Sequence, residues 1–177
     1  MPLSCPAGYQ IEHLNDSHIR QPFSCGKVEL DLFISQTAGQ SARKGTSATH
    51  VIVPVNSLQI VGYVSLASAQ VPFQELPTEL AKPLKLPKKG LMPATLLGRI
   101  AVDAAHQKRG LGSFLMHYAL DICSRSSLDI GSSMVVLDAL DNEIAKLYAS
   151  YGFVPLVDHP LRMVLPMATI RKLLDAL

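Results

Sequence analysis

The sequence contains no tryptophan, and only 6% of its residues are aromatic. Platforms that stack nucleobases need several exposed rings, so they are scarce in this chain. The three cysteines, Cys5, Cys25 and Cys123, are odd in number and lack the paired spacing of a metal site. These absences argue against a disulfide framework and a zinc domain. They favour reduced thiols in a cytoplasmic protein, and we expect no bound metal.

Strong charge and long apolar runs are also missing. The formal net charge is +2, which permits an anionic partner without requiring one, while 48% hydrophobic residues are too many for a disordered chain. No apolar run approaches the ~20 residues of a membrane span, and the N-terminus lacks the basic-then-apolar order of a signal peptide. The 177 residues suit one folding unit, so we expect a single domain over residues 1–177.

The most informative segment is 94–128, which reads as a strand, a short basic turn and a helix. Apolar residues at 96–102 predict a buried strand, and apolar positions spaced from Leu111 to Ile122 predict a helix over 110–128. The turn between them is QKRGLG, residues 107–112. The first amides of a helix have no acceptor within the helix, and glycines let a phosphate approach the backbone. The pattern predicts a diphosphate cradle, with an ordinary strand–turn–helix corner as the alternative.

Two motifs carry a family resemblance. Gln107, Gly110 and Gly112 fill the pattern Gln/Arg-x-x-Gly-x-Gly/Ala, so the segment resembles motif A of the GCN5-related N-acetyltransferases (GNAT), which binds the pyrophosphate of acetyl-coenzyme A. A later stretch, with Asn142 near its start and Tyr148 before Gly152-Phe153, resembles the helix after the fifth strand in the same superfamily.

The resemblance implies specific roles for these residues. Tyr148 would donate its proton to the coenzyme A sulfur, since a phenol with a pKa of about 10 stays protonated at neutral pH. The alternative for Tyr148 is packing in the core. Either Asp141 or Asn142 can cap the helix, so the alternative for Asn142 is a capping role without cofactor contact. The implied acetyl-coenzyme A contacts are Ile100, Ala101, Val102, Gln107, Lys108, Arg109, Gly110, Leu111, Gly112, Ser113 and Asn142.

The N-terminal half narrows the resemblance. The stretch from Phe23-Ser24-Cys25-Gly26 to Leu32-Phe33-Ile34 resembles the opening of the TacT-like toxin acetyltransferases of type II toxin–antitoxin systems. This implies acetylation of the α-amino group of aminoacyl-tRNA, neutralisation by a small ribbon-helix-helix antitoxin, and a homodimer. An α-amino group has a pKa of about 7.7–8.0, so it demands no strong base.

No base is evident in the sequence. Asp103 and His106 near the turn are expected to be structural, and Glu143 is expected to pair with Lys146. Scattered surface charge is the alternative to a basic rim for tRNA phosphates, for which the candidates are Arg20, Arg43, Lys44, Lys85, Lys88, Lys89 and Arg99.

Two other functions stay open on the sequence. The chain could acetylate a small-molecule, peptide or protein-lysine amine, or it could bind coenzyme A without catalysis. In each case the implied fold is a single-domain α/β GNAT fold, flanked by helices. Its mixed, mostly antiparallel sheet has about six or seven strands, splayed between the fourth and fifth.

The remaining elements follow from local pattern. We expect helices over 27–40, 142–151 and 167–177, and a two-residue hairpin loop at Asn56-Ser57. We expect a long proline-rich loop over 70–93, because prolines exclude a continuous helix or a central strand there. Besides 96–102, the expected strands are 9–14, 49–55, 58–69, 133–140, 153–157 and 161–165.

Overall fold

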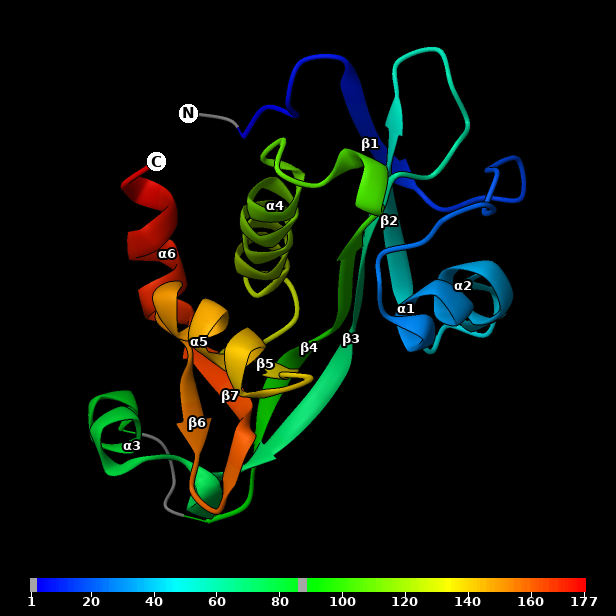
Figure 1. The fold of residues 1–177 in the computed structure, drawn as a ribbon. Helices are drawn as coiled ribbons and strands as arrows, with labels where there is room; N and C mark the ends of the chain where they lie inside the picture. The colour runs from blue at the N-terminus through cyan, green and yellow to red at the C-terminus, as the bar shows by residue number, and fades with distance from the viewer. Residues whose placement is uncertain (1–2, 86–88) are drawn as a thin grey trace. The chain divides into compact units, whose positions relative to one another are not determined.

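A computed structural model describes residues 3–85 and 89–177 (Figure 1). The described residues form one sheet of seven strands in the order β1-β2-β3-β4-β5-β7-β6. The strands are β1 (Tyr9–His13), β2 (Ala48–Pro54), β3 (Gly62–Pro72), β4 (Leu91–Val102), β5 (Met134–Asp138), β6 (Val154–Leu156) and β7 (His159–Pro166). The helices are α1 (Val28–Leu32), α2 (Ala38–Arg43), α3 (Thr78–Leu84), α4 (Leu111–Ser126), α5 (Asn142–Ser150) and α6 (Met167–Asp175).

The sheet is mixed and mostly antiparallel, as predicted. β1–β2, β2–β3, β5–β7 and β6–β7 pair antiparallel, whereas β4 and β5 pair parallel. The parallel ladder covers only the residue pairs from Ala94–Met134 to Leu96–Val136. Residues 97–102 of β4 therefore continue beyond the ladder with β5, as the predicted splay between the fourth and fifth strands requires.

The chain divides into two compact units. Unit 1 comprises residues 1–67 and 97–119, and unit 2 comprises residues 68–96 and 120–177. The single acetyltransferase domain expected over 1–177 stays a prediction.

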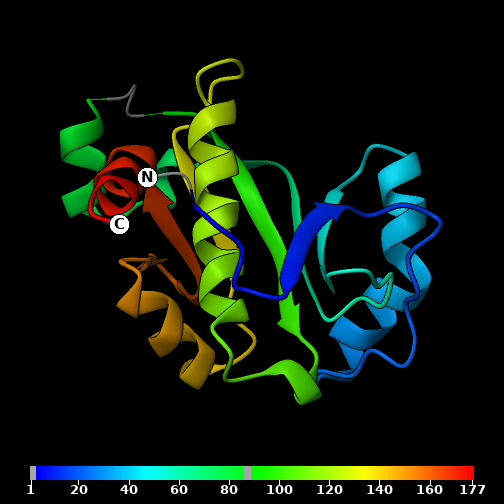
Figure 2. The ribbon, with the colours of Figure 1, turned by 90° about the horizontal axis from the view of Figure 1, so that it is seen from above.

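In unit 1, α1, a π-helical turn η1 (Phe33–Thr37) and α2 follow one another as a nearly continuous helical segment (Figure 2). Residues from this segment and from β2, β3 and β4 share one core, which contains Phe33, Ile34, Val51, Tyr63 and Ala101. The alternation of strand side chains explains this core, since residues two apart on a strand point to the same face. The predicted helix over 27–40 is confirmed, with a π-turn inside it that the sequence pattern did not reveal.

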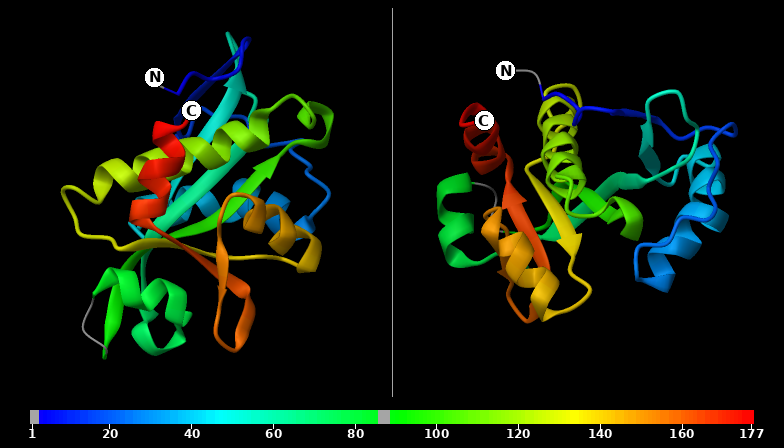
Figure 3. Two further views of the ribbon diagram at one scale, coloured as in Figure 1. Left: turned by 90° about the vertical axis from the view of Figure 1, so that its left-hand side faces the viewer. Right: turned by 45° about the horizontal axis from the view of Figure 1, so that its top comes forward.

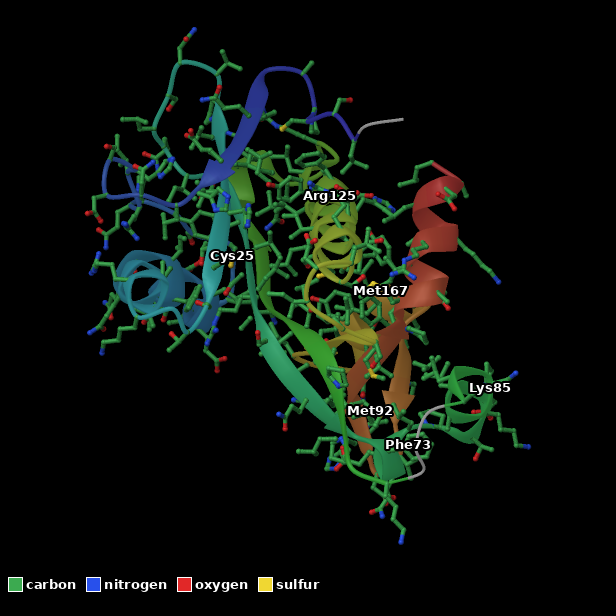
Figure 4. The ribbon with its side chains drawn as sticks, turned by 180° about the vertical axis from the view of Figure 1, so that it is seen from behind. Cys25, Phe73, Lys85, Met92, Arg125 and Met167 are labelled. Carbon is green, nitrogen blue, oxygen red and sulfur yellow. The ribbon has the colours of Figure 1, made fainter. Side chains whose placement is uncertain are left out.

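In unit 2, β6 and β7 form a hairpin, and α5 and α6 both contact β7 (Figure 3). The core of this unit joins Val71, Met92, Met134 and Val164, and Phe73 packs against it (Figure 4). The helices expected over 142–151 and 167–177, and the strands expected between them over 153–157 and 161–165, are confirmed within a few residues.

Two expectations are wrong. The two-residue hairpin at Asn56-Ser57 does not form, because β3 begins at Gly62, which pairs with Ile52. Residues 58–60 bond instead to Ile19, whose amide donates to the Leu58 carbonyl at 2.8 Å and whose carbonyl accepts from Ile60 at 3.0 Å.

The proline-rich stretch 70–93 is not one loop. β3 runs through Pro72, a 3-10 turn η2 covers Phe73–Glu75, and α3 covers Thr78–Leu84. Pro77 precedes the first helical residue and accepts bonds from Leu80 and Ala81, while Pro83 lies in the last turn. Pro77 precedes the helix and removes no bond within it, and Pro83 removes only the bond that its nitrogen would donate to the Glu79 carbonyl. A short helix therefore forms where a proline count argues against one.

No helix in residues 3–85 or 89–177 combines the length and apolar character needed to cross a membrane.

Candidate active site

The predicted diphosphate cradle is a turn between β4 and α4. We call residues 103–113 the cofactor turn. Asp103 begins it by capping the 3-10 turn η3 (Ala104–His106), where its carboxylate accepts from the Ala105 amide at 3.0 Å. Lys108 and Gly110 then adopt left-handed conformations, with φ of 61° and 79°. The Gly110 carbonyl accepts from Phe114 at 3.0 Å, which starts α4.

The cofactor turn presents a run of amides to a ligand. Within the described ranges, no amide from Lys108 to Ser113 donates to a protein acceptor. A Cβ built on Gly110 meets nothing within 4 Å, so the backbone there is open to an incoming group. Successive free amides at a helix N-terminus, together with the helix dipole, bind phosphate oxygens. The geometry fits a diphosphate and needs no side chain to do so.

Two side chains of the turn bind the protein itself. Gln107 Nε2 donates to the Val102 carbonyl at 3.0 Å and to the Cys25 carbonyl at 3.3 Å. Arg109 donates to the Tyr9 hydroxyl at 3.1 Å and to the Ala105 carbonyl at 3.3 Å. The side-chain nitrogen of Gln107 already donates to two protein carbonyls. If Gln107 contacts the cofactor as predicted, its backbone would make the contact.

The strand residues assigned to the acetyl group adjoin this turn. Ile100, Ala101 and Val102 are the last three residues of β4, past the point where pairing with β5 ends at Leu96. Unit 1 therefore holds these residues and the cofactor turn in one continuous segment.

Tyr148 and Asn142 lie on α5, in unit 2. Asp141 caps this helix, because its carboxylate accepts from the Ile144 amide at 2.9 Å. Of the two capping candidates, Asp141 is therefore the cap. Asn142 is the first residue of the helix and is exposed. The helix ends before Gly152, whose φ of 101° requires the left-handed conformation expected of a glycine there.

The Tyr148 phenol is half-buried, and its ring lies 6.1 Å from that of Phe153 between centroids. Burial, with a smaller contribution from nearby Tyr151, raises the pKa of Tyr148 to about 12. Tyr148 is therefore a protonated phenol with a donor hydrogen to offer.

The basic candidates fall into both units. In unit 1, Arg20 and Arg43 converge over Gly39: a Cβ there would lie 3.2 Å from Arg20 Nη1 and 3.5 Å from Arg43 Nη1. Asp16 lies 3.4 Å from Arg43 Nη1 and partly offsets this charge. The Arg99 guanidinium lies 4.1 Å from the centroid of the Phe33 ring.

Lys44, also in unit 1, is the C-cap of α2. In unit 2, Lys85 ends α3 (Figure 4) and Lys89 is exposed, while Lys88 lies outside the described residues. A single basic rim stays a prediction.

The structural roles expected for nearby charged residues are confirmed. Glu143 and Lys146 pair at 2.9 Å on the exposed face of α5. Asp103 bonds backbone amides, including that of Ser24 at 2.9 Å, and His106 Nδ1 lies 3.4 Å from its carboxylate. The contact with Ser24 was missed by the sequence pattern, because no local spacing links positions so far apart. No group of three or more His, Cys, Asp or Glu side chains in the described ranges is arranged to hold a metal ion.

Comparisons with known proteins agree with this geometry. A family model described as an acetyltransferase (GNAT) domain matches residues 48–155. The chain is 31% identical to the probable toxin TacT of Sinorhizobium fredii, over 93% of this chain and 94% of that protein. It is 29% identical to a tRNA-acetylating toxin of Mycobacterium tuberculosis, over 95% of this chain and 98% of that protein.

Two solved structures of AtaT share the fold. AtaT complexed with acetyl-methionyl-tRNAfMet has a TM-score of 0.85 and 28% identity, over 93% of this chain and 98% of that one. An AtaT mutant toxin bound to the C-terminus of the antitoxin AtaR and acetyl-CoA has a TM-score of 0.78 and 25% identity, over 94% of this chain and 98% of that one. With a cofactor turn of matching chemistry and a family model that spans more than half its length, this chain belongs to the GNAT acetyltransferases.

Proposed function

We propose that this chain transfers an acetyl group from acetyl-coenzyme A to the α-amino group of an aminoacyl-tRNA and thereby blocks translation. The observation that carries the proposal is the run of free amides from Lys108 to Ser113 at the start of α4. Its family supplies the reaction class, and its relatives named as toxins, one of them tRNA-acetylating, suggest the acceptor.

The cofactor turn would bind the donor. The amides at Lys108, Arg109, Gly110, Leu111, Gly112 and Ser113 suit the diphosphate of coenzyme A, and Lys108 adds positive charge beside it. The backbone of Ile100, Ala101 and Val102, beyond the ladder with β5, would bond the acetyl and pantetheine groups. Asn142, exposed at the start of α5, would contact the pantetheine arm.

Acetyl-coenzyme A supplies an activated acetyl thioester. Amides of β4 near the acetyl oxygen would stabilise the negative charge that develops there. Tyr148, with a pKa raised to about 12, would donate a hydrogen bond to the departing sulfur. The amine would form the new C–N bond as the C–S bond breaks. The departing sulfur would take its proton from the Tyr148 hydroxyl, and the proton lost by the amine would restore that hydroxyl.

The acceptor needs little activation. An α-amino group with a pKa of about 7.7–8.0 is about one-tenth neutral at pH 7, against well under one-thousandth for a lysine with a pKa of about 10.4. The absence of an evident base in the sequence is compatible with an α-amine and disfavours a lysine acceptor.

An aminoacyl-tRNA acceptor also implies which molecules the chain binds and in which compartment it acts. Arg20, Arg43, Lys44 and Arg99 of unit 1, and Lys85 and Lys89 of unit 2, would contact phosphates of the tRNA. A small ribbon-helix-helix antitoxin would inhibit the enzyme, as the AtaT complex with the antitoxin AtaR suggests. Aminoacyl-tRNA is a cytoplasmic substrate, so we place the activity in the cytoplasm and expect a homodimer there.

The test is transfer of labelled acetyl groups to charged and uncharged tRNA. We expect label on charged tRNA alone, loss of transfer in Tyr148→Phe, and retained transfer in Tyr151→Phe, which changes a second tyrosine near the end of the same helix. Label on free amines or lysine peptides without tRNA would favour a different acceptor. Coenzyme A binding with no transfer would make the chain a non-catalytic module.

A further inference from the structure

A short segment before α1 is fastened to the cofactor turn. All four backbone polar groups of Ser24 and Cys25 are hydrogen-bonded. The Ser24 amide donates to Asp103 Oδ1 at 2.9 Å, and its carbonyl accepts from the Ala104 amide at 2.8 Å. The Cys25 amide donates to Asp31 Oδ1 at 2.8 Å, and its carbonyl accepts from Gln107 Nε2 at 3.3 Å. We call these four bonds the clasp.

Two side chains of the cofactor turn serve the clasp and the turn together. Asp103 holds Ser24 with one carboxylate oxygen and the Ala105 amide with the other. Gln107 holds the Cys25 carbonyl and the Val102 carbonyl at the end of β4. The positions of Ser24 and Cys25 are therefore coupled to the position of the turn through the side chains of Asp103 and Gln107.

The clasp continues into the helical segment that supports Arg99. Asp31 of α1 binds the Cys25 amide, and the buried Tyr63 hydroxyl donates to the Leu30 carbonyl of α1 at 2.7 Å. Phe33 follows directly after α1, and its ring lies under the Arg99 guanidinium. All of these groups belong to unit 1.

We propose that Asp103 and Gln107 are positioning residues that hold α1 and the Phe33–Arg99 pair in a fixed position relative to the cofactor turn. Through this contact Asp103 and Gln107 influence binding of the acceptor and not binding of coenzyme A. The inference rests on the proposed function, because it takes Arg99 as an acceptor contact. Gln107 thereby differs from a cofactor ligand: its side chain bonds the protein, whereas the backbone amides of the turn would bind the diphosphate.

Hydrogen exchange measured by mass spectrometry on the full chain tests the clasp directly. Gln107→Met keeps the length of the side chain and removes its donor, and Gln74→Met is a matched control at an exposed glutamine in unit 2. Without ligand, we expect exchange in peptides covering 24–27 to speed up about tenfold in Gln107→Met and not in the control. Unchanged exchange at 24–27 in Gln107→Met would overturn the inference.

The same exchange measurement with coenzyme A added distinguishes a positioning role of Gln107 from direct binding of the cofactor. We expect coenzyme A to protect peptides covering 108–113 equally in the wild type and in Gln107→Met, and to protect 24–33 only in the wild type. Loss of protection at 108–113 in Gln107→Met would make Gln107 a cofactor ligand and overturn the inference. No protection at 108–113 in the wild type would contradict the proposed function, while the ligand-free exchange at 24–27 would still decide whether the clasp exists.

Steady-state kinetics give a second readout. Gln107→Met and Asp103→Ala should raise KM for the charged tRNA about tenfold and leave KM for acetyl-coenzyme A within about twofold. Asp103→Asn retains one acceptor oxygen and should give an intermediate KM for the tRNA. Equal rises in both KM values, or no rise in either, would refute the positioning role.

Discussion

Mildly acidic conditions should weaken the folding of this chain through one histidine. His50 lies on β2 and is 5% exposed. Its Nδ1 is 2.9 Å from the Tyr118 hydroxyl, and its ring centroid is 4.2 Å from that of His13 on β1. Burial, and then the charge of His13, lower the pKa of His50 to about 4.

The magnitude follows from the difference between the folded and unfolded states. An unfolded histidine has a pKa of about 6.5, so between pH 6.5 and about pH 4 the unfolded chain carries a proton at position 50 that the folded chain lacks. Stability therefore falls as the pH falls through this window, by about 1.4 kcal/mol for each pH unit. The full effect is about 3 kcal/mol, a large part of the free energy of unfolding of a typical domain.

Urea unfolding at a series of pH values checks this. His50→Gln keeps a polar partner for Tyr118 and removes the titration, so its free energy of unfolding should depend less steeply on pH between 6.5 and 4. His159→Gln, at a side chain that is 53% exposed, serves as the control and should retain the wild-type slope. Identical slopes in His50→Gln and the wild type would refute the reasoning.

Three further predictions follow from single contacts. Tyr148→Phe should lower kcat about 10²-fold and change the free energy of unfolding little, because it removes the donor hydrogen but keeps the ring that lies beside Phe153. Gly39→Ala places a Cβ 3.2 Å from Arg20 Nη1, so it should displace that guanidinium and reduce the salt dependence of KM for charged tRNA. Asp141→Ala removes the cap of α5 and should cost about 1 kcal/mol in thermal unfolding.

The parts of the fold set by local sequence were predictable. The strand, turn and helix around Gly110 follow from contiguous residues, as does the end of α5 at Gly152, so their determinants are visible in one short window. The hairpin at Asn56 was not predictable, because Ile19 bonds residues 58–60 and draws them away from β2. α3 was hidden because a proline count argues against any helix there, whereas Pro77 lies before α3 and Pro83 removes only one of its internal hydrogen bonds.

The same division holds at the site. The free amides of the cofactor turn were predictable, since a helix N-terminus leaves them without partners whatever surrounds it. The role of the Gln107 side chain was not, because the Cys25 carbonyl that it binds lies 82 positions earlier in the chain. The stacking of Arg99 on Phe33 likewise depends on tertiary packing, which spacing alone does not encode.

The most direct test of the account is calorimetry with coenzyme A and with pantetheine, which lacks the diphosphate and the 3′-phosphoadenosine attached to it. The wild type should bind coenzyme A far more tightly. Gly110→Val should strongly reduce that difference, whereas Gly45→Val, at another glycine with positive φ and open surroundings, should preserve it. Equal affinity of the wild type for coenzyme A and pantetheine would contradict the claim that the amides opening α4 bind the diphosphate.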